Sequence, residues 1–154
     1  MIADYENFWK PKIDTIANQK PYDLRTRAIL LKSYSKPLTQ LGESLKKEEN
    51  YKDLSDKIFT QAIEISNDNA PALHDLAQSY LSQNDFQKAE ELETKALKID
   101  PNQYQSHKTL GSLYLKQNNK KKAYFHLRKY LNLAPDAQDR QQIEEVVEKL
   151  KKEL

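Results

Sequence analysis

The hydrophobic residues between positions 70 and 100 recur at spacings of three and four, with one interruption at Asn84-Asp85. The first run consists of Leu73, Leu76, Ala77 and Tyr80. The second run consists of Phe86, Ala89, Leu92, Ala96, Leu97 and Ile99. Asparagine and aspartate favour turns and helix starts, and Pro101 stops the second run. The pattern therefore predicts two antiparallel helices joined at residues 84–85.

The same pattern recurs 34 residues further along the chain. Residues 70–103 align with residues 104–137 without a gap, and ten of the 34 positions are identical. A repeat of this period is typical of solenoids in which each repeat is one helical hairpin. The identical pairs include Leu76/Leu110, Tyr80/Tyr114, Asn84/Asn118, Ala89/Ala123 and Pro101/Pro135. We therefore expect two stacked hairpins, at 70–103 and 104–137.

A third and less regular repeat precedes these two, at residues 35–69. It has apolar and small residues in the same order, but it is one residue longer and has Asn67 where the others have proline. Its two helices are in register only if the extra residue lies near Glu49-Asn50. We interpret residues 35–69 as a degenerate first repeat.

The flanking segments are predicted to be helical caps. Residues 138–154 carry apolar residues at helical spacing with charged residues on the other side, as the end of a solenoid requires. Residues 1–34 predict two helices, the first restarted by Pro11 and the second opening at Pro21, and they form either a cap or a degenerate hairpin. The apolar residues of the C-terminal segment are Ile143, Val146, Val147, Leu150 and Leu154.

The order of these positions resembles the tetratricopeptide repeat, whose signature runs W-x2-L-G-x2-Y, then A-x3-F, then P. The repeat at 104–137 has, in that order, His107, Leu110-Gly111, Tyr114, Ala123, Leu127 and Pro135. The repeat at 70–103 has Leu73, Leu76-Ala77, Tyr80, Ala89, Glu93 and Pro101. The resemblance covers residues 35–137. It implies an all-α, right-handed solenoid of helix-turn-helix hairpins with helical caps.

Small residues occupy one equivalent position in all three repeats, as Gly42, Ala77 and Gly111. A small residue lets one helix settle closely against its neighbour. These two glycines are the only ones in the chain, and they are 69 residues apart, so they cannot form a phosphate-binding loop. We therefore interpret them as packing residues, and we expect Gly111→Leu to loosen the third hairpin.

The composition offers little for catalysis. The absence of cysteine excludes disulfides, thiolate zinc sites and thiol nucleophiles. His74 and His107 fall on the first helices of adjacent repeats, but no carboxylate is spaced to complete a metal site with them. We therefore expect no enzymatic activity, no metal and no cofactor.

The family resemblance assigns ligand binding to a concave groove lined by the first helix of each repeat. The implied lining residues are Thr39, Gln40, Glu43, Lys46, His74, Asp75, Gln78, Leu81, Ser82, Lys108, Thr109, Ser112, Leu115 and Lys116. Such a polar groove with a few apolar contacts suits an extended peptide or a partner helix.

The resemblance also implies which ligand to discount. Members of the family that bind a chaperone tail hold its carboxylate with a clamp of lysine, asparagine and arginine. Lys108 fits one lysine of the clamp, but Ser112 replaces its companion asparagine. Asp75 and Thr109 stand where the clamp needs asparagine or arginine. We therefore expect a peptide or protein surface other than a chaperone tail.

Charge is distributed unevenly along the chain. The net charge is only +2, but residues 104–137 carry +6 and residues 70–103 carry −3. The basic patch of the third repeat comprises Lys120, Lys121, Lys122, Arg128 and Lys129. We expect it to attract an acidic partner segment or membrane headgroups. The alternatives are a role in solubility and attraction to the acidic repeat of a stacked assembly.

The sequence thus predicts a non-catalytic protein–protein interaction scaffold or adaptor. Two alternatives stay open: an RNA-binding helical-repeat protein and a self-association module that forms a homo-oligomer within a larger assembly. Glu43 and Asp75 would repel phosphates, so nucleic acid is not the expected partner. The sequence contains no signal-peptide pattern and no apolar run long enough to span a membrane. The expected location is the cytoplasm, unless a signal or anchor has been removed.

Overall fold

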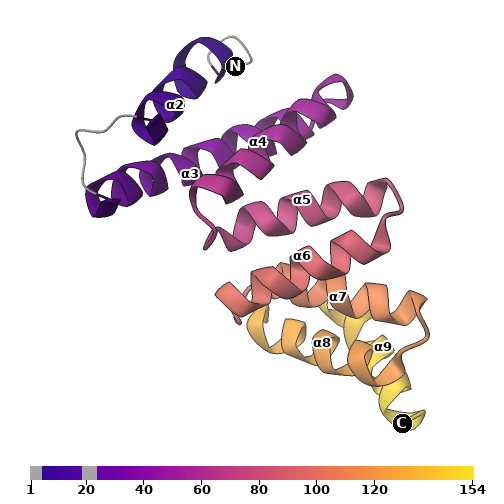
Figure 1. Ribbon diagram of the computed structural model, residues 1–154. Coiled ribbons are helices and arrows are strands. Elements are labelled where there is room, and N and C mark those ends of the chain that lie inside the picture. Colours follow the sequence, from indigo (N-terminus) through magenta and orange to yellow (C-terminus); the bar gives the residue numbers. More distant parts are fainter. Residues whose placement is uncertain (1–4, 19–23) are drawn as a thin grey trace. The chain divides into compact units, whose positions relative to one another are not determined.

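The computed structural model describes residues 5–18 and 24–154, and within these residues the protein is all-α, as the sequence predicts. The helices pair into antiparallel hairpins (Figure 1). Their order is η1 (Tyr5–Trp9, a π-helix), α2 (Lys10–Asn18), α3 (Leu24–Lys46), η2 (Glu49–Tyr51, a 3₁₀ helix), α4 (Lys52–Ile65), α5 (Ala70–Ser82), α6 (Phe86–Ile99), α7 (Tyr104–Lys116), α8 (Lys120–Leu133) and α9 (Arg140–Lys152).

The chain divides into two compact units. The N-terminal unit comprises residues 1–75 and the C-terminal unit residues 76–154, so the division falls within α5. In the N-terminal unit, α3 packs along α4, and α2 contacts α3. In the C-terminal unit, α7 packs along α8 and also contacts α6, while α9 packs on α8.

Helix α3 is longer than the sequence suggests. It runs without a break through 23 residues, across the boundary between residues 34 and 35, where the sequence places the start of the first repeat. Pro37 lies inside it, although a proline removes one helical hydrogen bond. Pro11 occupies the second position of α2, which follows the π-helix η1 directly. Residues 1–4 and 19–23, including the helix start predicted at Pro21, lie outside the described residues.

Two of the turns in the C-terminal unit, at Asn84 and Asn118, form where the sequence predicts helix breaks. Asn84 and Asn118 adopt left-handed backbone angles, with φ of 61° and 56°. Asparagine tolerates this conformation better than most residues. The next residue caps the following helix: the side chain of Asp85 accepts a hydrogen bond from the Lys88 N–H, and that of Asn119 accepts one from the Lys122 N–H.

Both glycines lie where two helices of a hairpin meet. A Cβ atom at Gly42 would come within 2.5 Å of Cε1 of Phe59 on α4. A Cβ atom at Gly111 would come within 2.5 Å of Cδ2 of Leu127 on α8. Because real Cβ atoms do not approach so closely, the packing predicted for these two positions is confirmed.

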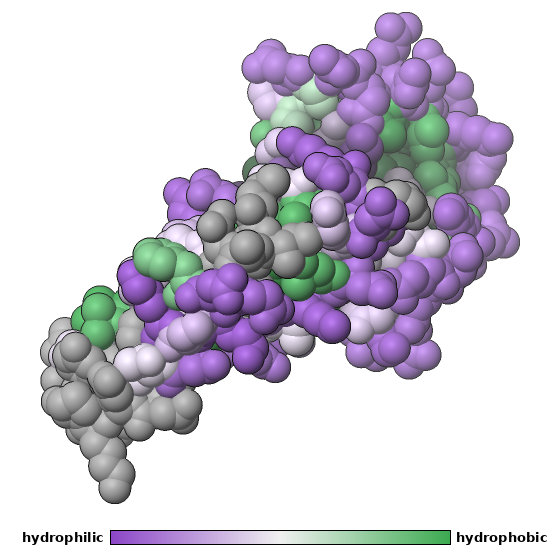
Figure 2. All heavy atoms as spheres, turned by 90° about the horizontal axis from the view of Figure 1, so that it is seen from above, coloured by the Kyte–Doolittle hydropathy of each residue, from purple (hydrophilic) through white to green (hydrophobic). Residues whose placement is uncertain are grey.

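Helix α9 covers the apolar side of α8. Val147 and Leu150 are buried in a core cluster that includes Leu127 and Tyr130 of α8, whereas Leu154 lies beyond the helix and is 54% exposed. Figure 2 shows one face of the molecule, where hydrophilic residues predominate and hydrophobic residues surface in small separate areas. Within the described residues, none of the helices is both long enough and apolar enough to span a membrane.

Candidate functional site

In the N-terminal unit, the residues implied for the groove form a charged cluster. Gln40 and Glu43 are exposed on α3, and His74 on α5 is half-buried. Nζ of Lys46 lies 3.3 Å from Oδ1 of Asp75. Partial burial, and then the charge of Asp75 and a hydrogen bond with it, raise the pKa of Glu43. The cluster therefore holds two neighbouring carboxylates, with the ammonium groups of Lys46 and Lys47 close enough to oppose the rise in pKa.

Thr39 belongs to the interior rather than to this surface. It is 4% exposed, and its hydroxyl donates to the backbone carbonyl of Ser35. The amide of Asn69 donates to the hydroxyl groups of both Ser35 and Thr39. Asn69 also caps α5, because its side-chain oxygen accepts the N–H of Ala72. The structure thus corrects the groove: Thr39 ties α3 to the turn between α4 and α5 and is not available to a ligand.

In the C-terminal unit, the first helices of two hairpins meet through Gln78 and Thr109. Nε2 of Gln78 donates to Oγ1 of Thr109 at 2.9 Å, and it lies 3.4 Å from Oε1 of Glu93. Both residues are half-buried, whereas Ser82 at the end of α5 is exposed. These two helices therefore present a joined polar surface.

Helix α7 leaves one stripe open to solvent. It is formed by Lys108, Ser112, Leu115 and Lys116, which recur at the spacing of one helix face and are all exposed. Leu115 is 37% exposed, and its counterpart one repeat earlier, Leu81, is half-buried. The stripe, which we call the α7 stripe, thus combines an apolar contact with polar and basic groups.

The two lysines of this stripe already have neighbours. Nζ of Lys108 lies 2.7 Å from Oδ2 of Asp139, at the start of α9, and Asp139 also accepts a hydrogen bond from the Tyr130 hydroxyl. These bonds, from Lys108 first and then Tyr130, lower the pKa of Asp139. Lys116 lies over the ring of Phe86, 5.3 Å from its centroid. Lys108 therefore fastens α7 to α9 as well as facing solvent.

His107 pairs with His126 of α8. Their Nδ1 atoms are 3.0 Å apart, and Nε2 of His107 lies 3.2 Å from the carbonyl oxygen of Pro101. Nε2–H of neutral His107 therefore donates to that carbonyl, which leaves its Nδ1 to accept from His126. Burial, and then the neighbouring His107, lower the pKa of His126 to about 4. Burial also lowers the pKa of His107. The pair is a neutral interior contact at physiological pH.

A carboxylate links α6 to α7 beside this pair. The Tyr114 hydroxyl donates to Oε1 of Glu90 at 2.7 Å, and Nε2 of Gln117 donates to Oε2 at 3.1 Å. Burial, followed by the bond to Glu90, raises the pKa of Tyr114 to about 12. Burial opposes ionisation of Glu90, but the two hydrogen bonds outweigh it and lower its pKa. Sequence spacing alone gives no sign of this link.

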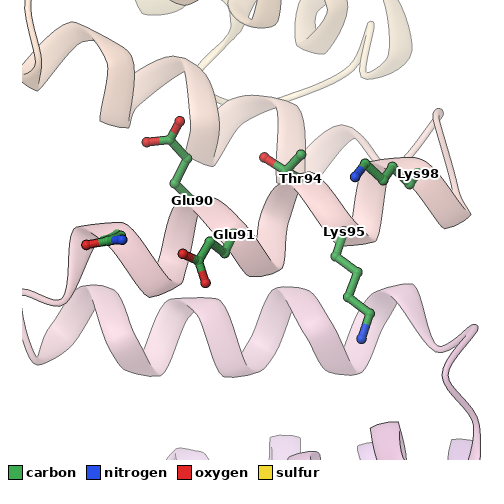
Figure 3. A pocket seen from close by; sticks show the side chains of 6 residues that line it. Glu90, Glu91, Thr94, Lys95 and Lys98 are labelled. Atoms are coloured by element: carbon green, nitrogen blue, oxygen red, sulfur yellow. The ribbon is translucent and has the colours of Figure 1, made fainter.

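The outer faces of the second helices carry two hollows that the sequence does not reveal. One, of about 540 Å³, is lined only by residues of α6. Figure 3 shows Glu90 and Glu91 toward one end of it and Lys95 and Lys98 toward the other. The second, of about 260 Å³, is lined by Tyr124, Phe125, Arg128, Lys129 and Asn132 of α8.

The basic patch is divided between engaged and open side chains. Lys120 pairs with Glu153 at 3.1 Å, and Lys122 lies 4.6 Å from the ring centroid of Tyr114. Arg128 donates to the Tyr124 hydroxyl at 3.1 Å. Lys121 and Lys129 are exposed. Lys120 and Lys122 of the patch therefore contact other parts of the C-terminal unit, whereas Lys121 and Lys129 are open to solvent.

A group of three or more histidine, aspartate or glutamate side chains able to hold a metal ion is not found among residues 5–18 and 24–154. What the site does offer is a set of hydrogen-bonding and charged groups around a few exposed apolar side chains. Such groups can bind and orient a partner.

Successive antiparallel helical hairpins place the protein in the class of helical-hairpin repeat proteins. Two family models, both described as tetratricopeptide repeat, match residues 76–148 and residues 58–91. The chain belongs to the tetratricopeptide repeat family. No significant match to a curated protein was found.

Solved structures agree with this assignment. The Arabidopsis OM64 TPR domain is 22% identical, with a TM-score of 0.67 over 80% of this chain and 99% of that chain. The first TPR of Spaghetti (RPAP3), bound to the HSP90 peptide SRMEEVD, is 16% identical, with a TM-score of 0.65 over 77% and 93%. The O-GlcNAc transferase of Thermobaculum terrenum is 22% identical, with a TM-score of 0.61 over 68% of this chain and 20% of that chain. At these identities the likeness concerns the fold.

Proposed function

We propose that the protein is a non-catalytic interaction scaffold whose C-terminal unit binds a peptide or partner helix on its first helices. The observation that carries the proposal is the α7 stripe, where Leu115 stays 37% exposed among Lys108, Ser112 and Lys116. An exposed leucine can receive an apolar side chain, while hydroxyl and ammonium groups pair with peptide carbonyls and carboxylates.

The hydrogen bond between Gln78 and Thr109 supports this role because it fixes α5 against α7 before a ligand arrives. The salt bridge between Lys108 and Asp139 fixes α7 against the start of α9 in the same way. A surface that is already ordered loses little entropy on binding. We therefore expect the ligand, rather than the protein, to change shape.

The solved TPR domain of Spaghetti that holds a chaperone peptide supports a peptide as the class of ligand. We do not propose the same peptide for this chain. Of the clamp positions named above, only Lys108 has the residue that the resemblance implies, and its ammonium group is shared with Asp139. Thr109 already accepts a hydrogen bond from Gln78. A ligand without a required terminal carboxylate fits these groups better.

The test uses the full chain with a blocked stripe. Ser112→Arg combined with Leu115→Glu changes two exposed residues, so the variant should fold. Thr94→Arg on α6 is the matched control, because Thr94 is also an exposed helical residue with a hydroxyl. Partners are captured on the immobilised proteins, identified by mass spectrometry, and their segments are titrated by fluorescence anisotropy.

We expect a partner segment that binds wild type and Thr94→Arg equally and binds the double variant at least tenfold more weakly, as the loss of an interface anchor implies. Equal binding to all three proteins would place the interface elsewhere. Equal loss in the control and in the double variant would show that the loss is not specific to the α7 stripe.

A further inference from the structure

The outer face of α8 surrounds an exposed aromatic ring with positive charge. Phe125 is 53% exposed, and helix α8 contains five basic and no acidic residues. Lys121 lies four residues before Phe125, while Arg128 and Lys129 lie three and four residues after it. Residues at these spacings share a helix face. Three cations therefore flank one phenyl ring.

The hollow beside Phe125 is small, and several of the side chains that line it contact other residues of α8. Its volume of about 260 Å³ lies below the roughly 300–1,000 Å³ of small-molecule sites and suits one or two side chains. Arg128 is held by its bond to the Tyr124 hydroxyl and lies 5.6 Å from that ring centroid. Phe125 rests edge-on against His126, with centroids 5.1 Å apart. Three of the five lining side chains therefore have contacts within α8.

Within residues 5–18 and 24–154, the cations that flank Phe125 have no carboxylate partner in ion pairs. Among the residues that the structure describes, no carboxylate forms an ion pair with Lys121, Arg128 or Lys129, whereas Lys120 does pair with Glu153. The three lysines at the start of α8 also oppose the helix dipole, which favours negative charge at that end. A negatively charged partner would pair with these cations and would also offset the unfavourable interaction of the lysines with the helix dipole.

The preceding repeat supplies an internal comparison. The hollow on α6 uses the positions 34 residues earlier, so Glu90 stands for Tyr124, Glu91 for Phe125 and Lys95 for Lys129 (Figure 3). That hollow has two carboxylates and no aromatic residue in its lining. The same backbone position thus carries different chemistry in two adjacent repeats, and only the α8 hollow matches a ligand that is both acidic and apolar.

We infer that the outer face of α8 is a second binding site, which takes an acidic peptide segment anchored by one aromatic or large aliphatic side chain. The anchor packs beside Phe125 in the hollow, and the acidic residues around it meet Lys121, Arg128 and Lys129. The amide of Asn132, at the edge of the hollow, pairs with the peptide backbone. One exposed ring flanked by three cations fits a single anchoring side chain better than a broad lipid surface. This site shares no residue with the α7 stripe, so it goes beyond the function proposed above.

The probe is a fluorescein-labelled peptide of alternating aspartate and serine with one central tryptophan, titrated into the full chain by anisotropy. A second peptide has alanine in place of the tryptophan. The variants are Phe125→Ala and the double variant Arg128→Glu/Lys129→Glu. The control, Lys95→Glu/Lys98→Glu on α6, makes the same change in net charge at exposed positions of the equivalent face. Melting curves establish that every variant is folded.

We expect Phe125→Ala to weaken binding of the tryptophan peptide about fivefold to tenfold, and the α8 charge reversal to weaken it more than about tenfold. The α6 control and Ser112→Arg/Leu115→Glu should stay within about twofold of wild type. The alanine peptide should bind weakly and equally to wild type and Phe125→Ala.

Three results would overturn the inference. Equal weakening by the α6 and α8 charge reversals would show that binding depends only on the net charge of the protein. Equal affinity for the tryptophan and alanine peptides would show that no aromatic side chain anchors the peptide. Phosphatidylserine vesicles form the last arm: if they bind in a way that needs Phe125 while the tryptophan peptide does not bind, the surface contacts a membrane instead.

Discussion

A leucine side chain at position 111 would have to occupy space that Leu127 already fills. A Cβ atom there would lie 2.5 Å from Cδ2 and 2.7 Å from Cγ of Leu127, and 3.3 Å from its backbone nitrogen. Leu127 is wholly buried. The end of its side chain can rotate, but Cγ and the backbone can yield only if α8 moves away from α7.

The magnitude follows from two opposing terms. Overpacking a core costs about 1–3 kcal/mol, and four added carbons place Gly111→Leu near the upper end, at about 3 kcal/mol. In the opposite direction, leucine stabilises a helix more than glycine does, by up to about 1 kcal/mol. We therefore expect the free energy of unfolding to fall by about 2 kcal/mol, and the melting temperature to fall by about 4–8 °C for a chain of this length.

Urea unfolding and thermal melts measure this effect, with Ser112→Leu as the control. That variant adds the same side chain one position along α7 at an exposed site, so its stability should stay within about 0.5 kcal/mol of wild type. In Gly111→Leu/Leu127→Ala the new leucine fills the space vacated on α8, so the double variant should lose less stability than the two single changes added together. An unchanged melting temperature in Gly111→Leu, or strict additivity, would refute the reasoning.

Two further predictions concern the C-terminal unit. Because burial lowers the pKa of His126 to about 4 from 6.5, the unfolded chain takes up its proton first, and stability should fall as the pH drops from 6.5 toward 4. Thermal melts should show that the free energy of unfolding of wild type falls by about 2 kcal/mol between pH 7 and pH 5, and that it falls by less in His126→Gln. Equal losses in the two proteins would contradict a role of His126. Asn118→Ala should lower the free energy of unfolding by about 1 kcal/mol, whereas Asn118→Gly should not, because the backbone at 118 is left-handed; urea titrations showing equal stability would exclude strain at this turn.

Local rules predict the hairpins of the C-terminal unit well. Each depends on residues close in sequence: an asparagine that can turn the backbone, a capping side chain one residue later, and apolar residues at helical spacing. Asn84 and Asn118 could be recognised for this reason. The continuous α3 could not be recognised in this way. A proline such as Pro37 usually ends or kinks a helix, but here the helix tolerates the loss of the hydrogen bond.

The first-helix surface is harder to predict because a surface position does not fix what a side chain contacts. Thr39 has the helical spacing of a groove residue, yet the distant Asn69 draws it into the interior through a hydrogen bond. His107 pairs with His126, 19 residues away on the partner helix of its own hairpin. Both contacts depend on how two helices are rotated relative to each other. The apolar pattern shows which face of each helix is buried, but it does not show which individual side chains meet.

The outer hollows on α6 and α8 show what a repeat can and cannot specify. Equal spacing of apolar and small residues gives the two helices the same exposed positions, so both acquire a hollow at the same place. The side chains facing solvent are not constrained by that packing. They can therefore differ as much as Glu91 and Phe125 do while the hairpin stays the same. For this protein, we expect the differences between repeats at exposed positions to decide which partners bind, whereas the identities between repeats maintain the fold.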